Sequence, residues 1–313
     1  MQILLVTVHS IHLLVVGIGV CLPLVVILLN RKMIKLEDHG HRDAVWNTCR
    51  LLLRHSLFAI VIGSLFGFAL AGVVWSEDYH QRCHLVMTKF VWAGVEWLTS
   101  VLVVTAVYYH WRLAKGGVRG FWVRSIILLI ASFNLLYHLP ILFMVISAIP
   151  DAQVAHLVSV HEELSRQDFR DIAYSADIVS RLSHAILAML ATAFAYVAML
   201  GIRIANEHAD GVNRDCAISI CRWASRNVLI MLFVQIAFGI WALIAMPRSR
   251  MQNLIGNDFA ATVLFAAGIV LFFIQLQQWT GLLGERVKRT ELVKAIATLI
   301  TMYFCMVGAS ALS

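Results

Sequence analysis

The amino-acid sequence predicts an all-α integral membrane protein with about eight transmembrane helices. Of its 313 residues, 60% are hydrophobic and 14% are charged, and the mean hydropathy is +0.81. Soluble globular domains carry about 25% charged residues, so the composition excludes that class. The chain also contains eight apolar runs, each long enough to cross about 30 Å of hydrocarbon at a rise of about 1.5 Å per residue. These runs lie at residues 2–30, 51–75, 88–111, 122–148, 178–202, 222–246, 258–283 and 291–312.

The first run is a transmembrane helix rather than a cleaved signal peptide, because it is too long and seven further spans follow it. It carries His12, about ten residues from its outer end and therefore roughly 15 Å deep. The second helix contains Gly63, Gly67 and Gly72. Glycines at such spacings allow two membrane helices to approach closely.

The third and fourth helices each carry an ionisable residue at depth. Glu96 lies about eight residues inside the outer boundary, where a carboxylate is protonated, paired or in contact with water. It is therefore part of a proton path or a neutral acid bonded to a neighbouring helix. His138 lies at about the same depth as His12, and Pro140 bends the same helix and frees a backbone carbonyl.

The longest loop, residues 150–177, lies outside, and its segment 153–170 reads as one amphipathic surface helix. His184 follows near the start of the fifth helix. The pattern predicts two four-helix bundles. Residues 1–206 supply the first five helices, and residues 207–313 supply three further helices.

Basic residues are concentrated on one side of the predicted membrane. Of the 25 lysines and arginines, 18 fall in the segments 31–54, 112–124, 203–226 and 286–294. The positive-inside rule places these segments in the cytoplasm, so both termini face outside. This asymmetry accounts for the net charge of +7, and no nucleic-acid partner is needed to explain it.

The six cysteines show no CxxC or CxxCH spacing. The sequence therefore excludes c-type haem attachment, iron–sulfur clusters and zinc fingers.

Histidines carry the functional signal. His12, His138 and His184 all fall in the outer half of the membrane, on the first, fourth and fifth helices. A neutral imidazole in hydrocarbon is costly unless something binds it, and axial ligation of haem iron removes that cost. The three histidines therefore predict one or two b-type haems near the outer face. The alternative is a histidine hydrogen-bonded to a carbonyl of the next helix.

Further ligands are weaker candidates. His55 and His110, at the inner edge, could hold another haem. If a methionine opposes His184, depth favours Met306 or Met302 over Met231, although methionine in helices more often serves packing.

The pattern resembles subunit I of the cytochrome bd quinol oxidases over roughly the first 200 residues. The matching stretches are His12-Leu-Leu-Val-Val-Gly-Ile-Gly19, Glu96 with Thr99-Ser100, and Arg181-Leu-Ser-His184-Ala. By this resemblance, His12 is an axial ligand of the active-site haem, Glu96 belongs to a proton path, and His184 ligates a low-spin haem b opposite a methionine. The chain departs from the family in having eight helices rather than nine, a short loop after the sixth helix and no Gly-Arg-Gln-Pro-Trp signature.

The sequence thus predicts a shortened, bd-like cytochrome b that binds one to three haems in the bacterial cytoplasmic membrane. It would act with other membrane subunits of a respiratory complex and move electrons between quinol or a periplasmic cytochrome c and a terminal acceptor such as oxygen. Two alternatives stay open, a haem-free multi-pass transporter and a structural membrane anchor.

Overall fold

A computed structural model describes residues 2–34, 38–113, 120–207, 211–284 and 288–313. Four basic residues of the charge count, Lys35, Lys115, Arg119 and Arg286, lie outside these ranges. No strand occurs in the described parts of the chain, and eight helices are long and apolar enough to cross a membrane. These are α1 (Gln2–Ile34), α2 (His39–Val73), α4 (Met87–Leu113), α5 (Phe121–Ala148), α8 (Ala176–Glu207), α9 (Val212–Ala245), α11 (Phe259–Gly281) and α12 (Arg289–Leu312). The predicted all-α membrane protein with eight apolar helices is confirmed.

Two helices begin well before the apolar runs that predicted them. α2 begins at His39 instead of near residue 51, and α9 begins at Val212 instead of near residue 222. The side chain of Asp38 caps α2 by accepting a hydrogen bond from the backbone N–H of His41 at 2.9 Å. Capped polar turns stay helical in water, so hydropathy marks the hydrocarbon and not the helix end.

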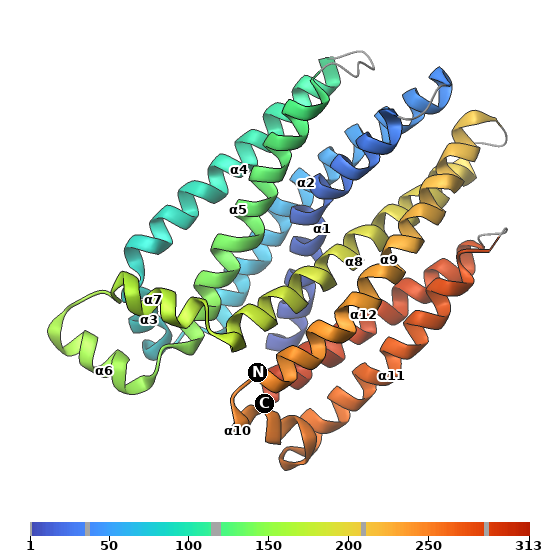
Figure 1. The fold of residues 1–313 in the computed structure, drawn as a ribbon. Helices are drawn as coiled ribbons and strands as arrows, with labels where there is room; N and C mark the ends of the chain where they lie inside the picture. Colours follow the sequence, from blue (N-terminus) through green and yellow to red (C-terminus); the bar gives the residue numbers. More distant parts are fainter. Residues whose placement is uncertain (1, 35–37, 114–119, 208–210, 285–287) are drawn as a thin grey trace.

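The eight helices form four antiparallel hairpins, and α1 lies at their centre, where it packs on α2, α5, α8 and α12. Figure 1 shows both termini at one end of the molecule, close to each other. We call this the terminal end. The opposite end, where α1 and α11 finish and where α2 and α9 begin, is called the basic end, because it carries Arg31, Lys32, Arg222 and Arg226.

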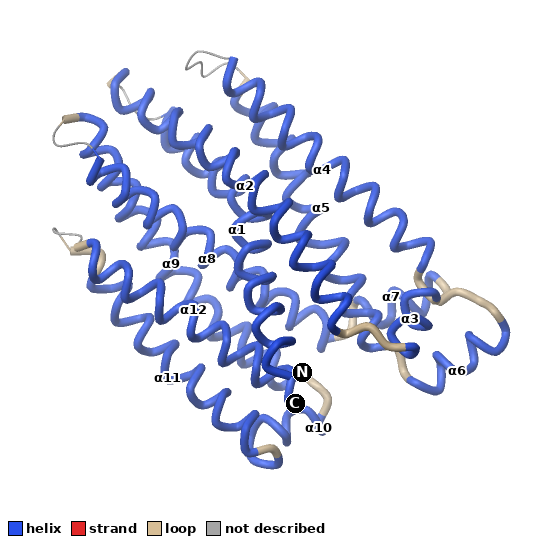
Figure 2. The backbone as a smooth tube through the Cα atoms, turned by 180° about the vertical axis from the view of Figure 1, so that it is seen from behind, coloured by secondary structure: helices blue, strands red, loops and turns tan. Residues whose placement is uncertain are grey.

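Short helices cover the terminal end (Figure 2): α3 (Glu77–His84), α6 (Asp151–Val160), α7 (Arg166–Ala173), α10 (Arg248–Gln252) and a π-helix, η1 (Asn253–Asn257). The single amphipathic helix predicted over 153–170 is wrong. α6 ends at His161, whose φ of 58° is left-handed, and Ser165 starts α7 by accepting a hydrogen bond from the N–H of Asp168. The intervening chain is anchored instead by the N–H of Leu164, which donates to the carbonyl of Leu85 at 2.8 Å.

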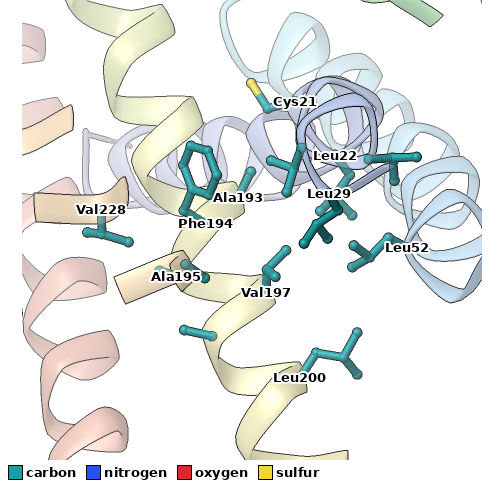
Figure 3. Packing of buried hydrophobic residues seen from close by; sticks show 14 of the residues in the cluster. Cys21, Leu22, Leu29, Leu52, Ala193, Phe194, Ala195, Val197, Leu200 and Val228 are labelled. Carbon is teal, nitrogen blue, oxygen red and sulfur yellow. The ribbon is translucent and has the colours of Figure 1, made fainter. Parts of the chain in front are cut away.

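The core lies where α1, α2, α8 and α9 meet (Figure 3), and Phe194 and Leu22 are among its largest fully buried side chains. Close helix approach depends on glycine there: a Cβ at Gly19 would lie 2.8 Å from the backbone nitrogen of Ile60. The expectation for α2 is confirmed at Gly63, which faces Val16, and at Gly67, which faces His12. Gly72 faces open space and takes no part in the contact.

Candidate functional site

His12 and His184 lie at the same level on neighbouring helices. α1 packs on α8, and both run from the terminal end towards the basic end. Their contact includes Gly17, where a Cβ would lie 3.0 Å from Cγ of Met189. His12 lies five residues before Gly17, and His184 lies five residues before Met189. Both separations correspond to about 7.5 Å along a helix. The structure therefore brings two of the sequence-predicted ligands to one layer of the molecule.

His12 is fixed between α1 and α2 by one hydrogen bond and one glycine. Its Nδ1 lies 2.9 Å from the carbonyl oxygen of Gly63. A carbonyl only accepts, so Nδ1 carries the proton and Nε2 keeps its lone pair. The ring rests on Gly67, where a Cβ would approach Cε1 to 2.9 Å. Imidazoles that bind metals through Nε2 characteristically donate their other N–H in this way.

His184 is held between α8 and α9 but is incompletely bonded. Its ring rests on Gly239, where a Cβ would lie 3.2 Å from Cε1. Its Nε2 lies 3.4 Å from the amide nitrogen of Gln235, whereas Nδ1 and the amide oxygen of Gln235 are buried with no hydrogen-bond partner in the structure. Buried polar atoms without partners cost free energy, which favours a ligand at this position. Ligation of a metal through Nε2 would require the Gln235 amide to give way.

His138 is paired with Glu96. Its Nδ1 lies 2.6 Å from Oε2 of Glu96, across the α4–α5 hairpin, and the two side chains are 36% and 32% exposed. The sequence indicated both residues separately, one as a haem candidate and one as a proton carrier, and missed their contact. Glu96 precedes the last residue of α4 by as many residues as His138 follows the first residue of α5. That symmetry about the hairpin is the signal that could have found the pair.

The remaining candidates have separate surroundings. His55 has its Nδ1 2.9 Å from the hydroxyl of Tyr196, and His110 is exposed near the end of α4. Met306 packs on α11, where a Cβ at Gly268 would collide with its sulfur. The described contacts of His184 are with α9, so they do not place Met306 opposite that histidine.

The candidate ligands are isolated histidines, which suit a metal centre whose other ligands come from a cofactor. Among the described residues, no group of three or more His, Cys, Asp or Glu side chains could hold a metal ion. A zinc or calcium site built from side chains needs at least three. Haem iron takes only one or two axial ligands from the protein, because the porphyrin supplies the others. Isolated histidines such as His12 and His184 fit that requirement.

No protein-family model matches the sequence, and no curated protein matches it.

Proposed function

We propose that the protein is a haem b-binding membrane subunit of a bacterial respiratory electron-transfer complex. One observation carries this proposal: His12 donates Nδ1–H to the carbonyl of Gly63 and keeps Nε2 free of a proton. A lone pair on a partly buried imidazole in an apolar bundle is suited to an axial position on iron. The resemblance to subunit I of the bd oxidases, described above for the first 200 residues, supports the same assignment.

In this proposal, His12 and His184 would hold the haem iron, and His138 and Met306 are further candidates. Bound haem iron supplies one-electron chemistry by cycling between its ferric and ferrous states. The chain positions the two histidines. The carbonyl of Gly63 keeps the proton of His12 on Nδ1, and Gly67 and Gly239 leave room for the rings of His12 and His184. Glu96 and His138 place a carboxylate oxygen 2.6 Å from an imidazole nitrogen, and two such groups side by side suit a path for the proton that accompanies the electron.

The proposed topology follows the charges. The basic end faces the cytoplasm and both termini face outside. Helices α1, α2, α4 and α5 form one four-helix bundle, and α8, α9, α11 and α12 form the other. The terminal end then meets quinol or a periplasmic cytochrome c, and other subunits of the complex cover part of the remaining helices. The haem-binding part, residues 1–206, includes α8, and residues 207–313 add the last three membrane helices.

A structural anchor is the competing function, and one observation favours it. The bond from His12 to Gly63 is also the bond of a histidine that only joins two helices. In an anchor, loss of such a bond costs on the order of 1 kcal/mol and changes nothing else. An anchor of this kind would carry no haem and would not absorb visible light. The two functions therefore differ in their absorption spectra.

Absorption spectra of the purified protein, oxidised, reduced with dithionite and then exposed to carbon monoxide, test the proposal. A Soret band that shifts on reduction supports haem binding. A further shift with carbon monoxide would indicate an open iron position and oxygen chemistry, and no such shift would indicate electron transfer alone. A colourless protein that carries its full complement of other subunits would reject haem binding.

A further inference from the structure

A basic pocket opens at the basic end, opposite to the end at which His12 and His184 lie. Its volume is about 680 Å³. It lies between α1, which contributes Arg31 and Lys32, and α9, which contributes Arg222 and Arg226, and Leu283 closes it just after α11. These positions are at the end of the helices opposite to both termini in Figure 1.

Cations predominate among the residues that line the pocket. Four of its eight lining residues are cations, and none of the eight is an aspartate or a glutamate. Lys32 donates from Nζ to the hydroxyl of Ser219, a neutral partner, at 3.2 Å. Arg31 and Arg226 are exposed. Like charges held together near hydrocarbon repel one another, so an anion in the pocket would stabilise this arrangement.

Apolar side chains adjoin the cations on the side of the membrane. Leu28 lies one helical turn before Lys32 towards the middle of α1 and is 44% exposed, and Leu283 is 38% exposed. Trp223, half-buried, also lines the pocket, and tryptophan is enriched at the level of lipid headgroups. The cations lie at the ends of the helices and the apolar side chains lie towards the middle of the membrane. This order is complementary to a phosphate joined to acyl chains.

We propose that this pocket binds the phosphate of an anionic phospholipid, with Arg31 and Arg226 at the headgroup and Leu28 and Leu283 against the acyl chains. The continuity between the cations and the exposed leucines favours a lipid over free phosphate, which has nothing to place on the apolar side. The site is independent of haem and goes beyond the proposed function.

Photo-crosslinking tests the site. The probe is phosphatidylglycerol with a diazirine on one acyl chain, added to the full chain in detergent, and the labelled peptides are identified by mass spectrometry. We expect labels on the α1 peptide around Leu28 and on the peptide that contains Leu283. Arg31→Gln with Arg226→Gln removes two exposed cations and should raise the probe concentration for half-maximal labelling roughly 30-fold.

The matched control is Arg203→Gln with Lys294→Gln. It removes the same charge at the same end, from side chains already paired with Glu207 and Glu291, and it should leave the labelling unchanged. Unlabelled phosphatidylglycerol should compete with the probe, and neither phosphatidylcholine nor inorganic phosphate should do so. Competition by inorganic phosphate would show that the pocket binds a free anion and not a lipid, and would overturn the proposal. Equal competition by phosphatidylcholine, equal loss in the control, or full labelling of the Arg31 and Arg226 variant would each overturn the proposal.

Discussion

The α1–α2 hairpin and the α4–α5 hairpin each hold a histidine, but they give it different partners. His12 bonds to a backbone carbonyl between helices that glycines bring close together. His138 lies against the carboxylate of Glu96 in a looser hairpin, with Nδ1 2.6 Å from Oε2, and both side chains remain about one third exposed. A carbonyl can only accept a hydrogen bond and so fixes one tautomer of the imidazole, whereas a carboxylate beside an imidazole brings together two groups that can exchange protons. The first arrangement suits metal ligation and the second suits proton exchange, although the sequence predicted both histidines as haem ligands.

The largest effect should follow removal of the ligands themselves. We expect His12→Ala and His184→Ala each to lose a haem or to change its spin state, because the iron would lack an axial nitrogen. Reduced-minus-oxidised spectra measure this. His110→Ala, an exposed histidine near the end of α4, should leave the spectrum intact. Unchanged spectra in both ligand variants would reject the assignment.

The glycine beside His12 gives the next largest effect. Gly67→Ala places a Cβ 2.9 Å from Cε1 of His12, and the bond to Gly63 restrains the ring from moving away. We expect a loss of about 1–3 kcal/mol in the free energy of unfolding, typical of overpacking, together with a shifted Soret band. Gly72→Ala is the control, because its Cβ would meet open space. If the two variants melt at the same temperature, the packing of His12 against α2 is not as described.

Separating Glu96 from His138 should have a smaller effect on stability and none on haem. A double-mutant cycle with Glu96→Gln and His138→Gln should give a coupling energy of about 1 kcal/mol, because the pair is partly exposed and hydrogen bonds in membranes are modest. We also expect slower proton uptake during turnover of the complex with an unaltered Soret band. A lost Soret band in His138→Gln would instead return His138 to the haem ligands.

The smallest effect is expected at the bond between His55 and Tyr196. Tyr196→Phe removes a hydroxyl that lies 2.9 Å from Nδ1 of His55 and should cost about 0.6 kcal/mol, measured from thermal unfolding. Haem content should not change. A spectral change in this variant would show that His55 is near a haem at the basic end.

The sequence predicted the number and order of the membrane helices because hydropathy over about 20 residues is a local property. It misplaced the starts of α2 and α9, because polar turns beyond the hydrocarbon can also be helical; Asp38 caps such a turn in α2, whereas α9 begins after Gly211 without a side-chain cap. It also merged α6 and α7, because an amphipathic pattern does not show the left-handed residue at His161.

The candidate residues were found, but their partners were not. Burial cost identifies His12 and Glu96 from the sequence alone. The bond of His12 to Gly63 and the contact of Glu96 with His138 depend on which helices pack together and in which register, and that is set by the whole bundle. Gly63 and Gly67 were predicted to bring α2 close to another helix, yet only the structure shows that Val16 packs on Gly63 and that the imidazole of His12 packs on Gly67.

The haem content of the purified chain, measured as pyridine haemochrome against protein concentration, tests the central claim most directly. The account predicts one to three haems of b type per chain. Fewer than about one haem per ten chains, in protein purified with its membrane partners, would contradict it and leave His12 as a bond between two helices.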